Sequence, residues 1–160
     1  ALLDHAQVIH QCGDNPATGD RRWLEELRGR LPAPLARRYT IVPYVGEELA
    51  GIYAAAALVI ARAGAGTVNE CCHLGLPAIY IPLPGARGDE QTANARVVER
   101  AGGCAVLPQS ELTPERLLTR LRALLAEPRR LKEMGERARS LAVPDAAERI
   151  VALLIETMAR

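Results

Sequence analysis

The sequence predicts an α/β protein built on a doubly wound, Rossmann-like parallel sheet with helices on both faces. Short apolar runs of β-type residues alternate along the chain with longer amphipathic stretches of helical period. The β-type runs are apolar over their whole length, which is typical of strands buried on both faces of a sheet. The stretches between them are long enough for helical crossovers, roughly a dozen residues, and such crossovers join parallel strands.

Each strand is expected where a short apolar run lies between Gly, Pro or polar residues. These runs are residues 7–10, 39–42, 57–60, 78–81 and 104–107. Helices are expected where apolar residues recur with helical spacing, near 20–29, 47–56, 67–75, 90–101, 114–126, 128–141 and 145–158. Thr113 and Pro114, and later Pro144 and Asp145, supply the capping residue and the proline that are typical of helix starts.

Composition limits the classes of function. With 160 residues the chain has the length of one ordinary domain, and its 49% hydrophobic and 24% charged residues exclude an extended disordered chain. The net charge of +1 gives no basic field for nucleic acid, and no apolar run reaches the roughly 18 residues of a membrane span. The chain begins without Met, and its first six residues resemble a helix end more than a signal peptide, so we expect a fragment of a longer protein.

The spacing of cysteine and histidine favours neither a metal centre nor a disulfide framework. Cys12, Cys71, Cys72 and Cys104 show no C-x-x-C spacing, and the three histidines have no ligand spacing with them. We expect thiols that pack as small apolar side chains in a reducing compartment, with Cys71 and Cys72 on different sides of one helix. No metal and no cofactor is predicted.

Sheets of this kind bind ligands in the loops at the carboxyl ends of their strands. The most informative loop follows residues 57–60, where Gly64 and Gly66 precede a helix expected to begin at Thr67. The N–H groups and positive dipole end of a helix favour an anion such as a pyrophosphate, and glycines let it approach closely. This is not the dinucleotide fingerprint, because Asn69 stands at the third glycine position, and no P-loop Gly-Lys-Ser/Thr follows.

Glu70 leaves two interpretations open. Residues 67–70 read Thr-Val-Asn-Glu, which matches a capping box in which Glu70 reaches back to the backbone N–H of Thr67. Beside a phosphate site, the same carboxylate could instead accept hydrogen bonds from a ribose diol.

The loop after residues 78–81 brings Asp89, Glu90 and Gln91 to the first turn of the next helix. Adjacent carboxylate and amide groups suit vicinal sugar hydroxyls, because they can both accept and donate hydrogen bonds. The alternative makes Asp89 an N-cap and leaves Glu90 and Gln91 as solvated first-turn residues. In a doubly wound sheet this loop should neighbour the Gly64 loop.

Two further loops are open to either interpretation. Residues 43–48 follow the second strand and offer backbone groups to the edge of a base, or they are simply a turn into a helix. At the end of the first strand, His10 is either a packed or solvent-facing side chain or a catalytic base.

Several segments follow one another in the order found in a known family, namely 9–13, 44–45, 62–70, 75–78, 81–82, 89–95 and 144–150. With them the chain resembles the MurG family of peptidoglycan glycosyltransferases, which transfer N-acetylglucosamine from UDP-GlcNAc to lipid I and so make lipid II. The resemblance covers nearly the whole chain. Its specific part is the pair of motifs R-A-G-A-x-T-x-x-E and D-x-Q-x-x-N-A.

The resemblance implies that the whole chain is the C-terminal, UDP-GlcNAc-binding domain of a GT-B enzyme. By matching positions, Glu70 would hold the ribose hydroxyls. The backbone of Ala65, Gly66 and Thr67 would face the diphosphate. Val45 would meet the uracil through its backbone.

The remaining implied positions concern the sugar and the support of the site. Glu90 and Gln91 would contact the GlcNAc hydroxyls, and Gln91 is the firmer match because the family varies at the other position. Supporting positions are Arg62, Gly64 and Gly13. Cys12 stands where the family often has Ser or Thr.

The implied reaction is an inverting, metal-independent displacement at the anomeric carbon, in which helix-end N–H groups stabilise the departing UDP. In the family a strand and a G-G-S-type loop open this half, and nothing like them precedes Ala1. That strand would lie between residues 7–10 and 57–60, so we expect a gap there. The acceptor site, general base and membrane-contacting surface belong to the absent N-terminal half, so no catalytic residue is expected here and the isolated chain should be inactive.

The resemblance also implies a location and leaves alternatives. The enzyme would be cytoplasmic, held peripherally on the inner face of the bacterial cell membrane by the absent half, with the UDP-GlcNAc donor and the lipid-linked acceptor as its partners. The same sequence fits a nucleotide-sugar-binding subunit of a split glycosyltransferase. It also fits a relative of the diacylglycerol galactosyltransferases, which use UDP-galactose.

Overall fold

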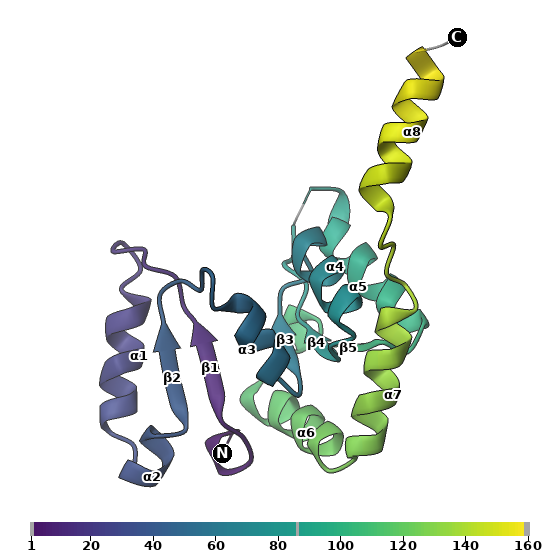
Figure 1. Ribbon diagram of the computed structural model, residues 1–160. Coiled ribbons are helices and arrows are strands. Elements are labelled where there is room, and N and C mark those ends of the chain that lie inside the picture. Colours follow the sequence, from purple (N-terminus) through teal and green to yellow (C-terminus); the bar gives the residue numbers. More distant parts are fainter. Residues whose placement is uncertain (1, 86, 159–160) are drawn as a thin grey trace. The chain divides into compact units, whose positions relative to one another are not determined.

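The computed structural model (Figure 1) describes residues 2–85 and 87–158, and the chain divides into two units. Unit 1 takes the residues up to Ala55 together with Pro114–Ala126. Unit 2 takes Ala56–Thr113 and the residues from Glu127 onward.

Unit 1 carries a two-stranded parallel sheet. Strands β1 (Val8–Gln11) and β2 (Tyr39–Val42) pair from Val8 opposite Tyr39 to Gln11 opposite Val42. Its helices are α1 (Asp20–Gly29), α2 (Ala33–Ala36), α3 (Leu49–Ala55) and α6 (Pro114–Leu125), after a 3-10 turn η1 (Leu2–Asp4). Helix α1 packs against β2 (Figure 1), so this βαβ unit places the loops after both strands at one edge.

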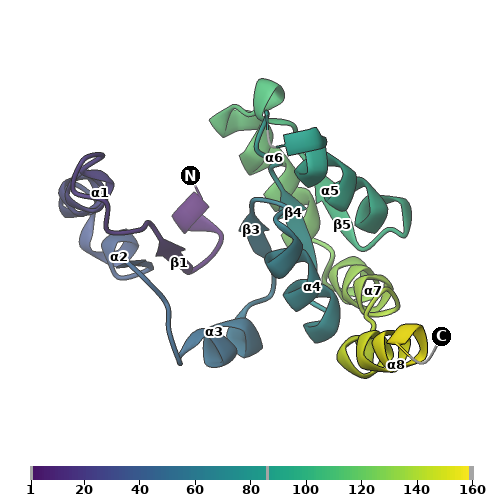
Figure 2. The same ribbon diagram turned by 90° about the horizontal axis from the view of Figure 1, so that it is seen from above.

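Unit 2 carries three parallel strands in the order β3-β4-β5, namely β3 (Val59–Ala61), β4 (Ala78–Tyr80) and β5 (Cys104–Val106). Helices α4 (Ala65–Leu74), α5 (Glu90–Arg100) and α7 (Pro128–Arg139) lie around them (Figure 2), and α8 (Ala146–Met158) follows. The short 3-10 turns η2 (Arg87–Asp89) and η3 (Gln109–Glu111) precede α5 and α6.

The core of unit 2 forms around the central strand β4, all three residues of which are buried. Ala63, Val68, Cys72, Ala95, Val98 and Ala138 from the loops and helices pack with β4 and β5 into one apolar cluster. Burying these side chains is the main favourable term for the unit. In contrast, no described residue of α8 is buried, and its apolar residues 150, 151 and 153–155 are more than half exposed.

Helices α4 and α7 approach each other through glycine. Gly75 ends α4 in the left-handed region, with φ 65°, which glycine adopts without strain. A side chain at Gly135 of α7 would collide with the carbonyl oxygen of Gly75. This contact sets the position of α4 against α7 within unit 2.

The predicted fold class is confirmed, since all five predicted strands and seven predicted helices are present and every strand pair is parallel. The strands form two sheets, and the break between them falls between β1 and β3, the two strands between which the sequence analysis expects a gap. Among residues 2–85 and 87–158, β1 is hydrogen-bonded only to β2 and β3 only to β4. No described segment supplies a strand that pairs with both. The one-turn helix α2 was also not predicted, because four residues are too short for a periodic pattern.

Candidate functional site

The start of α4 lies directly after β3, at the carboxyl end of that strand. The helix begins at Ala65, with Gly64 as its N-cap, and no side chain caps it. The first intrahelical bond runs from the Val68 N–H to the Gly64 carbonyl, at 3.0 Å. The N–H groups of Ala65, Gly66 and Thr67 therefore have no acceptor within the helix, which makes this end suited to an anion.

The predicted helix start at Thr67, and with it the capping-box interpretation of residues 67–70, is wrong. Gly64 has an extended backbone (φ −64°, ψ 149°), so the helix begins two residues earlier than predicted. Thr67 is then a first-turn residue and not a cap. Glu70 lies three residues further on, exposed and on the same side of α4.

Gly64 and Gly66 leave open space at the start of α4. A Cβ atom at either position would meet no atom within 4 Å apart from its chain neighbours and its own helix backbone, and neither glycine needs a left-handed backbone. The fold itself therefore does not require glycine at these two positions. A ligand that approaches the backbone closely would require it.

Arg62 joins the loop after β3 to the loop after β4. Its Nη1 donates to the carbonyl of Ile81 at 3.0 Å and to that of Pro82 at 3.3 Å. The prediction that these two loops are neighbours is thereby confirmed. Both belong to unit 2, so they form one edge of its sheet.

The loop after β4 is held by the first turn of α5. The N–H of Leu83 donates to Oε1 of Gln91 at 3.0 Å, which leaves the Nε2 group of Gln91 as its hydrogen-bond donor. Asp89 occupies the N-cap position of α5, but its backbone is left-handed (φ 52°) and its side chain makes no capping hydrogen bond. Glu90 is exposed in the first turn of α5. The loop residue Ala86 lies outside the described residues.

The loops of unit 1 meet at the ends of β1 and β2. Oε1 of Gln11 accepts the backbone N–H of Val45 at 3.1 Å. His10 shares a hydrogen bond of 2.7 Å with the Tyr39 hydroxyl, which fits the packed alternative for this histidine. Gly13 has φ 76°, a left-handed conformation that explains why glycine occupies this position.

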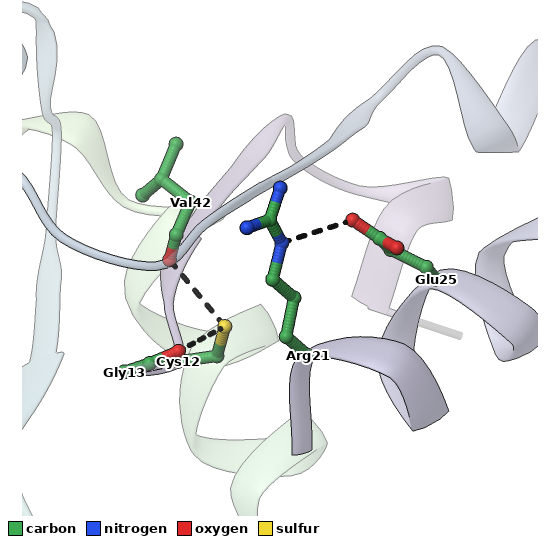
Figure 3. Close-up of polar contacts among 5 residues, drawn as sticks. All are labelled: Cys12, Gly13, Arg21, Glu25 and Val42. Atoms are coloured by element: carbon green, nitrogen blue, oxygen red, sulfur yellow. Dashed lines mark hydrogen bonds and ion pairs between the residues drawn. The ribbon is translucent and has the colours of Figure 1, made fainter. Parts of the chain in front are cut away.

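Cys12 joins the two strand ends through its thiol. Its Sγ donates to the carbonyl of Gly13 at 3.2 Å and to that of Val42 at 3.4 Å (Figure 3). The same view shows Arg21 paired with Glu25 on α1, at 3.2 Å. Because both acceptors of Cys12 are backbone carbonyls, a Ser or Thr hydroxyl could make the same contacts.

Three of the four cysteines are buried, as predicted, whereas Cys12 is only half-buried. Cys71, Cys72 and Cys104 are free and buried. Burial raises the pKa of all three thiols, that of Cys104 to about 12. They therefore stay neutral near pH 7 and pack as small apolar side chains.

Residues 2–85 and 87–158 contain no group of three or more His, Cys, Asp or Glu side chains placed to hold a metal ion. None of their helices is long and apolar enough to cross a membrane.

Two polar residues with no predicted role hold the loops of the candidate site. Gln11 bonds Val45, and Asn94 of α5 donates from Nδ2 to the carbonyl of Ala63 at 3.1 Å. Their position in the motifs 9–13 and 89–95 was visible in the sequence. Their partners were not, because each lies more than 30 residues away along the chain.

Comparison with known proteins identifies the family. Residues 2–150 match the family model described as the glycosyltransferase family 28 C-terminal domain. A Methylobacterium sp. protein named UDP-N-acetylglucosamine–N-acetylmuramyl-(pentapeptide) pyrophosphoryl-undecaprenol N-acetylglucosamine transferase is 41% identical, over 84% of this chain and 43% of the relative. The protein of the same name from Halorhodospira halophila is 42% identical, over 94% of this chain and 40% of the relative.

A solved structure shows the same architecture. The crystal structure of Acinetobacter baumannii MurG aligns with a TM-score of 0.77 and 36% identity, and the match covers 92% of this chain and 42% of that one. The chain thus spans less than half the length of these relatives. From the extent of the family match and the agreement in fold, this chain belongs to the glycosyltransferase family 28 C-terminal domains.

Proposed function

We propose that this chain is the donor-binding part of an inverting glycosyltransferase of peptidoglycan synthesis, which transfers N-acetylglucosamine from UDP-GlcNAc to a lipid-linked muramyl-pentapeptide. The names of the relatives support the choice of donor and acceptor. The observation that carries the proposal is the uncapped start of α4 at the carboxyl end of β3, with Glu70 one turn further along the same helix.

The diphosphate would be bound by the first turn of α4. The N–H groups of Ala65, Gly66 and Thr67 precede the first intrahelical bond, so they can donate to phosphate oxygens. The positive end of the helix dipole adds a favourable interaction with the negative charge. This charge grows as UDP departs, so the same N–H groups would stabilise the transition state more than the bound donor.

The nucleoside and the sugar would be held by further side chains and backbone groups. Glu70 would accept hydrogen bonds from the ribose hydroxyls. The N–H of Val45 already donates to Gln11, so its carbonyl is the group we assign to the uracil N3–H. Glu90 and the Nε2 group of Gln91 would contact the hydroxyls of GlcNAc, with Arg62, Gly64 and Gly13 shaping the loops.

A part of the enzyme outside this chain would bind the acceptor and contact the membrane. We propose that this other part supplies the general base, and that it holds the enzyme peripherally on the cytoplasmic face of the membrane. This chain would then position the donor and stabilise the leaving group, and by itself it would transfer no sugar.

Binding measurements on the 160-residue chain test the proposal. Titration with UDP, UDP-GlcNAc and UDP-galactose, followed by NMR or calorimetry, should show binding of all three, with UDP-GlcNAc bound more tightly than UDP-galactose. Glu70→Ala should weaken UDP binding about tenfold, a loss of about 1.4 kcal/mol. Glu136→Ala removes the same charge from an exposed site on α7 and should leave binding unchanged. A Glu70→Ala chain that binds UDP as tightly as the wild type would refute the site, and a preference for UDP-galactose would refute the donor.

A further inference from the structure

Asn94 reaches from α5 to the loop that begins α4. Its side chain is half-buried, and its Nδ2 donates to the carbonyl oxygen of Ala63 at 3.1 Å. Ala63 is completely buried between β3 and Gly64. A buried carbonyl needs a hydrogen-bond partner, and here the side chain of another helix provides it.

The bonded carbonyl belongs to the peptide that leads into α4. This peptide joins Ala63 to Gly64, and Gly64 is the N-cap of the helix. A change in ψ of Ala63 or in φ of Gly64, the torsions on either side of this peptide, would turn the first N–H groups of α4 away from their present direction. Glycine has more backbone freedom than any other residue, so an N-cap glycine by itself restrains this rotation little. The bond from Asn94 supplies a restraint that Gly64 does not.

The same face of α5 also holds the neighbouring loop. Gln91 lies three residues before Asn94, so the two side chains lie on one side of the helix. Gln91 accepts the N–H of Leu83 at 3.0 Å, while Asn94 donates to Ala63. Helix α5 thus fixes the loop after β4 and the loop after β3 with one amide each.

From this geometry we infer that Asn94 is a positioning residue, which holds the start of α4 in the orientation that binds a diphosphate. The inference rests on the proposed function. Its chemistry is specific, because a carbonyl acceptor needs a donor. An ionised carboxylate of the same size has no hydrogen to give and would repel the Ala63 oxygen.

Three variants of the 160-residue chain test this role: Asn94→Asp, Asn94→Ala and Ala93→Asp. The last adds the same charge at the exposed neighbouring position and controls for electrostatic repulsion of the ligand. UDP and uridine are titrated against each variant at pH 7.5. Thermal unfolding and the amide resonance of Gly64 report whether the fold and the 63–64 peptide are changed.

Asn94→Asp should weaken UDP binding about tenfold and leave uridine binding within twofold of the wild type, since only the diphosphate contacts the start of α4. Ala93→Asp should change UDP binding less than twofold. On acidification the introduced carboxyl gains a proton and can donate to Ala63, so the affinity of Asn94→Asp relative to wild type should recover. The UDP affinity of Asn94→Ala relative to wild type should not recover on acidification, because alanine has no donor at any pH.

The outcomes separate this inference from the proposed function. A wild-type chain that binds neither UDP nor uridine would overturn both. If the wild type binds UDP and Asn94→Asp binds it equally well, the inference alone is wrong. An equal loss of uridine and UDP binding in Asn94→Asp would also overturn it, because general damage to the fold would then explain the loss.

Discussion

The side chain of Gln11, at the end of β1, accepts the backbone N–H of Val45 in the loop after β2, at 3.1 Å. The bond joins the end of β1 to the loop after β2, at one edge of the unit 1 sheet. It also occupies the N–H of the residue that the family resemblance assigns to the uracil. Under the proposed function, Gln11 would support the loop that binds the base, and the Val45 carbonyl would accept a hydrogen bond from the base.

Replacing Gln11 tests this support. Gln11→Leu should weaken uridine and UDP binding by the same factor, severalfold, because both ligands carry the base. The free energy of unfolding should fall by only about 0.5–1.5 kcal/mol, since the freed N–H can be solvated. Calorimetric titration of both ligands and chemical denaturation measure these effects. Loss of UDP binding with uridine binding intact would contradict the assignment of this loop to the base.

Gly66→Ala should separate stability from binding. Alanine is the better helix former, and a Cβ here meets no protein atom within 4 Å, so the free energy of unfolding should rise by up to about 1 kcal/mol. UDP binding should weaken about tenfold, because the new methyl group occupies the space beside the diphosphate. Gly51→Ala in α3 is the matched control, since its Cβ also meets no atom within 4 Å. It should raise stability and leave UDP binding unchanged. Equal UDP binding by the Gly66→Ala chain would show that the ligand does not approach this turn.

Glu70→Gln tests recognition of the ribose. The wild type should prefer UDP to 2′-deoxy-UDP, because the Glu70 carboxylate would accept a hydrogen bond from the 2′-hydroxyl. Charge-assisted hydrogen bonds of this kind are stronger than neutral ones. The variant should lose most of that preference while its affinity for 2′-deoxy-UDP changes little. Competition titrations with the two nucleotides measure the ratio. A ratio that is the same in variant and wild type would place the ribose elsewhere.

Thiol labelling tests the burial of the cysteines. Cys12 is half-buried, whereas Cys71, Cys72 and Cys104 are buried and have raised pKa values. At pH 8 iodoacetamide should modify Cys12 first and leave the other three unmodified in the folded chain, because the thiolate is the reactive form. All four should react after denaturation. Mass spectrometry of the labelled peptides identifies the sites, and rapid labelling of Cys104 in the folded chain would contradict the structure.

Stability should fall in alkaline solution. The pKa of Cys104 is about 12 in the folded chain and 9 in its ordinary state. Its contribution is therefore complete below pH 9 and is lost as the pH rises toward 12. The raised pKa values of Cys71, Cys72 and Tyr80 act in the same direction. Each group that ionises only in the unfolded chain lowers the free energy of unfolding by up to about 1.4 kcal/mol per pH unit.

Chemical denaturation between pH 8 and pH 11 checks this dependence. The free energy of unfolding of the Cys104→Ala chain should decrease more gradually with rising pH than that of the wild type, whatever the variant's stability at pH 8. Identical slopes for the two proteins would show that this thiol is not the source.

The sequence by itself determined the five strands, the seven main helices and their parallel α/β arrangement. These follow from the period of apolar residues, which is a local property of the chain. The sequence also predicted that the loops after β3 and β4 are neighbours. The hydrogen bonds from Arg62 to the carbonyls of Ile81 and Pro82 confirm this. Burial of the thiols of Cys71, Cys72 and Cys104 was likewise predictable from composition and spacing.

Tertiary structure alone decided how those loops are held. The start of α4 at Ala65 depends on the extended backbone of Gly64, which no residue pattern specifies, so the predicted capping box failed. Gln11 and Asn94 find partners 34 and 31 residues away. Such bonds leave no periodic trace in the sequence, because they depend on which strands and helices lie side by side after folding.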